Sequence, residues 1–489
     1  MLSAIISREF LSNIINLRFI VGLVLCVIIS VACVMILTHD YQQEMADYNL
    51  RINLQDEFLS KYAHTNRMGG MITSQKPPER FRPLIIGIPR EANLGSFDDN
   101  PLPVLFPPLD FIFIVTIIMS LLAMLFSYDA ITGERQRGTL RLVISNSIPR
   151  AKILLAKFIG GTASLLIPFI LSLLAGALYI SINPAIQWDG STWAEFSLLI
   201  AASVTFISLF YLLGLMVSTF SRYSSTSILT CLFLWVLLIL VIPNMCPFIS
   251  AQLYRIPSIN KIERQLYYIR QVERDELGRE FSREVLKKFA TQYGVLYSEF
   301  ESLEFGGLWG ECSPANRKAT QQRAAADLEF KAMIDAFREQ INQAWNEANR
   351  IQGEKAQKIS RDRDTKVAAQ NKIAKNLTCI SPCANFIYVA TDLTGTGLRS
   401  FDYFDWLDRE YGKMFWPYLQ RKVQDAMKKD PTFETNSFLD ISDRPRFVFK
   451  EEALRDKLDA VLPYWGILVL FNVVFFVAAF AGFMRYDVR

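Results

Sequence analysis

The sequence has few of the residues, and none of the common motifs, that enzymes use for catalysis. Among its 489 residues only two are histidines, His39 and His64, which leaves little room for histidine-based chemistry. The Walker A, HExxH and GxSxG motifs are absent, and these are the usual signatures of ATP binding, zinc proteolysis and serine hydrolysis. A formal net charge of +4 indicates no basic surface for nucleic acid. We therefore expect no enzyme activity in this chain, and no catalytic residue, cofactor or metal of its own.

Charged residues are also missing from the interiors of six long apolar runs. Each run is near the roughly 20 residues that a helix needs to cross a bilayer. The runs are Phe19–Thr38, Leu109–Tyr128, Ile159–Ile182, Phe196–Thr219, Ser227–Cys246 and Leu462–Phe483. The third helix is expected to begin earlier and to cover 149–182. No cleavage site follows the first run, so we expect it to remain as a membrane anchor. The predicted fold class is an all-α membrane protein with six transmembrane helices.

The lack of intramembrane charge also bears on the source of energy. Ion-driven transporters usually place Asp, Glu, Lys or Arg within the membrane, where each costs at least ~2.5–3.5 kcal/mol. None lies in the interior of the six runs. If the protein moves a substrate, we expect the energy to come from a partner outside the membrane.

Lysine and arginine are unevenly distributed over the connections between the runs. Connection 129–148 is rich in arginine, whereas 183–195 contains neither residue type. Positively charged short loops stay in the cytoplasm. We therefore expect both termini, the tail 484–489 and connection 129–148 to be cytoplasmic. Segments 39–108 and 247–461 are then exoplasmic.

The N-terminal residues 1–18 carry a helical pattern of their own. Leu2, Ile6, Phe10 and Ile14 recur at helical spacing. This pattern predicts an amphipathic elbow helix in the cytoplasmic membrane interface. A helical extension of the first span is the alternative.

The large exoplasmic segment is predicted to be a mostly helical domain. Stretches 259–300 and 315–376 are amphipathic, the second with apolar residues at heptad spacing, and three glycines within 306–310 mark a turn. These features predict an antiparallel helical hairpin, with a compact helical domain as the alternative. The aromatic residues of 401–418 fit either a membrane interface or a soluble core.

The seven cysteines fall into two groups. Three lie inside apolar runs and are expected to be small core residues. The others are Cys246, Cys312, Cys379 and Cys383. An oxidising compartment would allow disulfides among these four, and the sequence does not choose among the three full pairings. Cys379 and Cys383 lack a second pair of ligands for a metal.

The most specific pattern follows the second apolar run. Its residues are Asp129, Gly133, Glu134, Arg135, Gly138, Thr139 and Leu140. The glycines would interrupt the helix of the second span, Asp129 or Thr132 would cap a new short helix, and Glu134 near its start would suit the helix dipole. Leu140 and the arginines would offer apolar and charged contacts to a partner. An ordinary positive-inside loop is the alternative, and it explains the arginines but neither the glycines nor the glutamate.

This pattern resembles the D-x-x-x-G-E-R-x-x-G-T-L motif of the ABC-2 type permeases of ABC transporters. The elbow helix and six spans fit the same family, and Ser381-Pro382, Gly395–Gly397 and the ending 485–489 resemble a branch with a large outer insert before the last span. The resemblance implies that 129–148 forms a coupling helix docking on a cytoplasmic ABC ATPase, which binds the ATP and Mg. It also implies a dimer with a second permease, identical or related, that exports a substrate across a bacterial inner membrane.

Two other functions remain open at this point. In a mechanotransmission protein, the ATPase would move the large outer segment against an exoplasmic accessory protein, and nothing would cross the membrane. In a membrane receptor or scaffold there would be no ATPase, and the coupling motif argues against this alternative.

Overall fold

In the computed structural model the regular structure of the described residues is almost entirely helical. The structure describes residues 2–63, 74–87, 109–140, 149–183, 186, 188–293, 322, 326–430 and 438–485. The chain divides into two compact units. The first unit is Met1–Met245 with Thr378–Arg489, and the second is Cys246–Leu377.

Six helices are long and apolar enough to cross a membrane, which confirms the predicted all-α membrane fold. They cover Leu17–Lys61, Phe111–Gln136, Arg150–Ile182, Gly190–Phe220, Ser224–Leu253 and Leu454–Met484. The uninterrupted ones are α2 (Leu17–Tyr62), α9 (Arg150–Ile182), α10 (Gly190–Phe220) and α21 (Leu454–Met484). The second comprises α5 (Phe111–Phe113), the π-helix η1 (Ile114–Met119), α6 (Ser120–Ser127) and α7 (Thr132–Gln136). The fifth comprises α11 (Ser224–Trp235), the π-helix η2 (Val236–Val241) and α12 (Ile242–Leu253).

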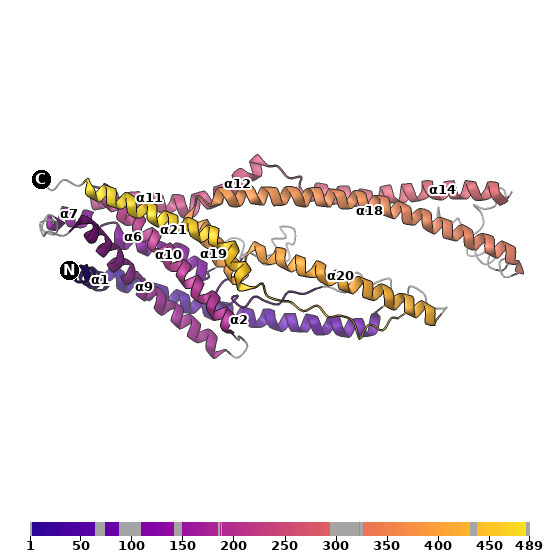
Figure 1. The fold of residues 1–489 in the computed structure, drawn as a ribbon, viewed down its shortest axis with the longest axis horizontal. Coiled ribbons are helices and arrows are strands. Elements are labelled where there is room, and N and C mark those ends of the chain that lie inside the picture. The colour runs from indigo at the N-terminus through magenta and orange to yellow at the C-terminus, as the bar shows by residue number, and fades with distance from the viewer. Residues whose placement is uncertain are drawn as a thin grey trace. The chain divides into compact units, whose positions relative to one another are not determined.

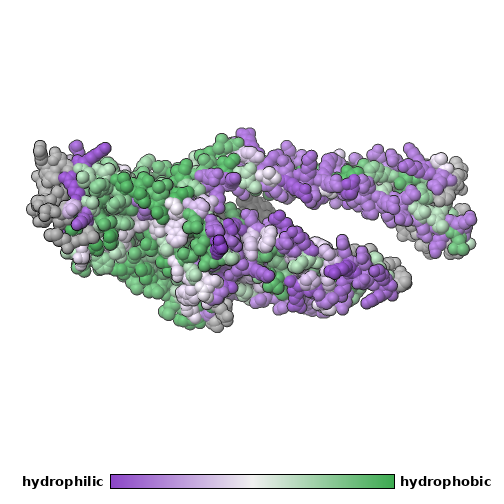
Figure 2. Space-filling model, viewed as in Figure 1, coloured by the Kyte–Doolittle hydropathy of each residue, from purple (hydrophilic) through white to green (hydrophobic). Residues whose placement is uncertain are grey.

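Helix α10 lies at the centre of the membrane bundle, where it packs against α6, α9 and α21. In its most apolar stretch 67% of the residues are buried, compared with 22% in α21. Gly161 of α9 lets this helix approach closely, because a Cβ there would overlap the Tyr211 phenol group. The face of the bundle that Figure 2 shows is mostly apolar. Such a surface suits contact with lipid.

The N-terminal helix α1 (Leu2–Ile14) is separate from α2, as the elbow prediction required. The break occurs because Asn16 is extended and its side chain accepts a hydrogen bond from the Arg18 backbone N–H. Helix α1 packs along α9. In Figure 1, α1, α7 and the end of α21 lie at one end of the bundle. We call it the α7 end.

The predicted outer segment 247–461 is not one body in the structure. Helices α19 (Pro382–Thr394) and α20 (Leu398–Lys429) belong to the first unit. Helix α19 packs between α10 and α21, with Phe386 stacked on Phe206 at 4.8 Å. It therefore enters the membrane bundle without crossing it.

Beyond the bundle, the far half of α2 packs against α20. Leu59 of α2 shares a buried cluster with Tyr411, Phe415 and Leu419. The predicted segment 39–108 thus begins as a continuation of the first span. Of the two predicted roles for the aromatic residues of α20, burial of Tyr411 and Phe415 fits the soluble core, and a role for the half-exposed Trp406 and Trp416 at a membrane interface stays a prediction.

The second unit contains the predicted helical hairpin, as far as the described residues extend. It is built from the end of α12, α13 (Ile259–Tyr267), the π-helix η3 (Tyr268–Glu273), α14 (Arg274–Tyr293) and most of α18 (Leu328–Thr378). Phe289 meets Phe337 edge-on at 5.2 Å, and Ser250 donates a hydrogen bond to the Gln370 carbonyl. The helices are therefore antiparallel, with heptad residues in the core. The predicted turn glycines lie outside the described residues.

Candidate functional site

The candidate site is the connection between the second and third spans. Helix α6 ends at Ser127, a turn follows, and α7 runs nearly to Gly138, whose φ of +75° requires the left-handed conformation that glycine adopts freely. The chain is helical again at Thr139 and Leu140. Residues 141–148 lie outside the described residues. Gly138 therefore interrupts the helix as predicted, whereas Gly133 lies within α7.

The start of α7 is capped differently from the prediction. Neither Asp129 nor Thr132 caps the helix with its side chain. The Ser218 hydroxyl of α10 accepts hydrogen bonds from the Ile131 and Thr132 N–H groups, each at 3.1 Å. Asp129 instead accepts from Arg18 of α2 at 3.1 Å. Because these partners come from other helices, α7 is tied to the bundle from its first turn.

Glu134 is at the centre of a buried charge cluster. Lys157 of α9 donates to Glu134 Oε1 at 2.8 Å and to Glu9 Oε1 of α1 at 3.0 Å. Arg8 lies 3.6 Å from Glu134 at the exposed rim. Lys157 is 3% exposed and Glu134 is 7% exposed. One ammonium group thus joins the connection to both α9 and the elbow helix. Because the group is buried, its removal is expected to lower the stability of the fold.

Arg135 and Leu140 also face the bundle. Arg135 donates to the Ser221 carbonyl at 2.8 Å, at the C-terminal end of α10 where a cation is favoured. Leu140 is fully buried in the hydrophobic core. The expectation that Leu140 contacts a partner is therefore wrong, because this side chain is already covered by its own bundle.

A narrow exposed edge remains on the connection. Gln136, Arg137, Gly138 and Thr139 are exposed, and the Arg137 side chain donates to the Gly133 carbonyl at 3.1 Å. The motif thus has two faces: its charged side chains hold it to four helices, and this edge is open to a partner. Sequence reasoning identified the motif residues but missed Lys157 and Ser218, which no spacing rule connects to it.

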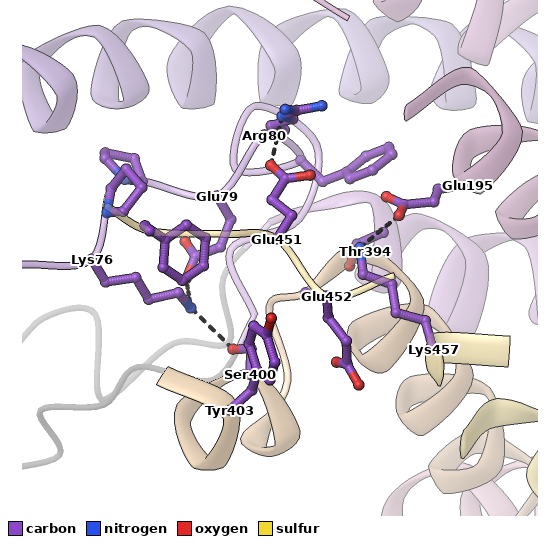
Figure 3. Close-up of a pocket in the computed structure, with 15 residues that line it drawn as sticks. Lys76, Glu79, Arg80, Glu195, Thr394, Ser400, Tyr403, Glu451, Glu452 and Lys457 are labelled. Atoms are coloured by element: carbon purple, nitrogen blue, oxygen red, sulfur yellow. Dashed lines mark hydrogen bonds and ion pairs between the residues drawn. The ribbon is translucent and has the colours of Figure 1, made fainter. Parts of the chain in front are cut away.

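A second charge network lies at the opposite end of the bundle (Figure 3). Arg80 bridges Asp189 at 2.7 Å and Glu451 at 2.6 Å. Lys457 of α21 contacts Glu195 of α10 at 2.6 Å, and both side chains are 7% exposed. Hydrogen bonds from Thr192, and then from Arg80, hold the pKa of the Asp189 carboxyl well below its usual range.

This network lines a cavity of about 60 Å³, room for a few water molecules. Lys76, in the segment preceding the second span, pairs with Glu79 at 2.7 Å and donates to Ser400 of α20 at 3.0 Å. The network therefore joins four chain segments that lie far apart in the sequence. Their separation explains why sequence patterns did not predict it.

The disulfide prediction is wrong for two of its four cysteines. Cys246 and Cys383 are buried free thiols, and Cys383 lies in the core beside Phe386. Cys383 therefore acts as a small core residue. Cys379 is half-buried just after α18, and Cys312 lies outside the described residues. A disulfide that involves either of these two cysteines remains a prediction.

Comparison with known proteins agrees with the resemblance. A family described as "ABC-2 family transporter protein" matches residues 3–488. The "Probable ABC transporter permease protein NosY" of Stutzerimonas stutzeri is 38% identical over 69 residues, which are 14% of this chain and 25% of that protein. The protein of the same name from Pseudomonas aeruginosa is 45% identical over 47 residues, 10% of this chain and 17% of that protein.

The matched segments thus span a quarter or less of these relatives' own length. The family match, in contrast, covers nearly the whole chain, and the six apolar helices fit a membrane-embedded permease subunit. The chain belongs to the ABC-2 family of transporter proteins.

Proposed function

We propose that this chain is the permease subunit of an ABC exporter in a bacterial inner membrane, with the α7 end in the cytoplasm. A partner ATPase, which holds the ATP and Mg, docks on connection 129–148. The observation that carries the proposal is the two-sided construction of this connection. Its exposed edge offers Gln136, Arg137 and Thr139, while its buried side is bonded to the bundle.

The bonds on the buried side define how movement would reach the spans. A displacement of α7 pulls on α9 and α1 through Lys157, on α10 through Ser218 and Arg135, and on α2 through Asp129. Because packed helices move as rigid bodies, the ATPase stroke becomes a rotation of the bundle. Six spans make half of a transporter of this kind, so the chain works as a dimer with an identical or related permease.

Charge reversal at Arg137 is expected to remove the partner ATPase from the purified chain. Arg137→Glu places a carboxylate on the exposed edge without disturbing a buried contact, so folding should be kept. We expect at least a tenfold lower recovery of a Walker-containing ATPase, corresponding to ~1.4 kcal/mol. The measurement is affinity purification from mild detergent followed by quantitative mass spectrometry.

The matched control is Arg409→Glu in α20, at the opposite end of the first unit. Arg409 is exposed and donates to the carbonyl four residues earlier, Asp405, as Arg137 does to Gly133. The control should recover as much ATPase as the wild type. Equal recovery from both variants would place the docking surface elsewhere, and no ATPase from the wild type under several extraction conditions would favour a receptor or scaffold.

Mechanotransmission is a second candidate, supported by the fifth span. The helix Ser224–Leu253 begins in the first unit and ends in the second, and α18 extends for 51 residues. If outer movement is the function, binding of an ATP analogue should change hydrogen exchange in 259–293 and 328–377 without any substrate. Unchanged exchange there, with changed exchange in the spans, would exclude this candidate.

A further inference from the structure

A groove that begins at the α7 end lies between the last turns of α10 and the length of α11. Its volume is about 570 Å³, and its walls include Met216, Phe220 and Leu234. The loop Ser221–Tyr223 forms its mouth. The groove is therefore apolar along the spans and polar where the spans end.

The side chains around the mouth are largely exposed. Phe220 is 56% exposed and Tyr223 is 62% exposed. Arg222 is exposed and forms no hydrogen bond or ion pair with any residue that the structure describes. Two other arginines at this end, Arg135 and Arg18, are instead engaged by carbonyl or carboxylate oxygens. Arg222 thus offers an uncompensated positive charge at the rim of an apolar groove.

We propose that this groove binds one anionic phospholipid. The lipid phosphate pairs with Arg222 and hydrogen-bonds to the Tyr223 hydroxyl, and one acyl chain lies along Met216, Phe220 and Leu234. Basic pockets between spans on the cytoplasmic side recognise anionic headgroups by charge, and the apolar wall adds the hydrophobic part of the affinity. The placement in the cytoplasmic leaflet rests on the proposed function.

The groove adjoins the candidate coupling connection. Ser221 accepts from Arg135, and Ser224 donates to the Gln136 side chain at 2.8 Å. A lipid that orders the loop Ser221–Tyr223 therefore also steadies α7. The bound lipid would act as a part of the link between the connection and α10.

The test uses the purified full chain and native mass spectrometry. Delipidated protein is incubated with phosphatidylglycerol or phosphatidylcholine, and retained lipid is counted. We expect one phosphatidylglycerol to be retained in preference to phosphatidylcholine, and Arg222→Gln to weaken its retention on the order of fivefold. Arg222→Lys should keep the preference, and an unchanged melting temperature of Arg222→Gln would show that folding is intact.

A second readout is hydrogen exchange in 132–136, which phosphatidylglycerol should slow in the wild type but not in Arg222→Gln. Equal retention of phosphatidylglycerol by both would overturn the proposal. The proposal would also be overturned if inorganic phosphate displaced the bound phosphatidylglycerol as effectively as added phosphatidylglycerol does. A complex of two copies of this chain that excludes lipid, and that dissociates when Phe220→Asn is introduced, would overturn it as well. The lipid-binding measurement needs no ATPase, so failure of the lipid proposal can be distinguished from failure of the proposed coupling role.

Discussion

Lys157→Met is expected to destabilise the chain by about 3–5 kcal/mol, because it removes the nearest cation from the buried Glu134 carboxylate and from the partly buried Glu9 carboxylate. Glu134 and Glu9 both contact this ammonium group through their Oε1 atoms, and the Glu134 Oε2 atom has no hydrogen-bond partner among the described residues. The change should lower the melting temperature in detergent. It should also disconnect the connection 129–148 from α9, so any ATPase that still binds would drive the spans poorly.

The control for this change is Lys152→Met on the same helix. Lys152 is exposed, and its loss should cost less than about 0.5 kcal/mol. The triple variant Glu9→Gln, Glu134→Gln, Lys157→Met removes the buried charges together and should recover much of the stability. If Lys157→Met melts like Lys152→Met, the cluster contributes nothing to the fold and the proposed link to α9 fails.

Lys457→Met is expected to have a similar effect at the opposite end of the bundle, again about 3–5 kcal/mol. It leaves the Glu195 carboxylate buried between α10 and α21, where its ammonium partner lies 2.6 Å away. The readout is thermal unfolding in detergent, followed for the single variants and for the double variant with Glu195→Gln. These variants form a double-mutant cycle, from which we expect a coupling energy between Lys457 and Glu195 well above that of a surface ion pair.

Arg455→Met is the matched control, since Arg455 is exposed in the same turn of α21. It should unfold close to the wild type. Additive effects of Lys457→Met and Glu195→Gln would contradict the prediction, because additivity means that the two side chains do not act as a pair.

The sequence predicted the six spans well, and two of its errors at their ends share a physical cause. The apolar run ends at the first charged residue, but the helix continues where a partner neutralises that charge. Helix α9 includes Lys157, as the predicted range 149–182 required, and Glu134 and Glu9 compensate its charge. Helices α10 and α21 extend past their predicted starts because Glu195 and Lys457 compensate each other. Such pairs join distant positions, so no local pattern contains them.

The candidate site was predictable in composition but not in orientation. The motif identified Asp129, Glu134 and Arg135, yet their charges alone do not tell a docking surface from an internal bond. All three are bonded to other helices of the chain. Helix α19 was missed for another reason, because its 13 residues are too few for a span and its core face is recognisable only once α10 and α21 are in place.

That short helix depends for its burial on a segment that follows it in the chain. Its 13 residues cover about 20 Å, less than the roughly 30 Å of a bilayer core. Ser381 at its start bonds to the Leu238 carbonyl within the fifth span, and its other end leads into α20. One of its walls is α10, which precedes it, and the other is α21, which follows it. A chain truncated before Leu454 would therefore leave the α21 side of this helix uncovered.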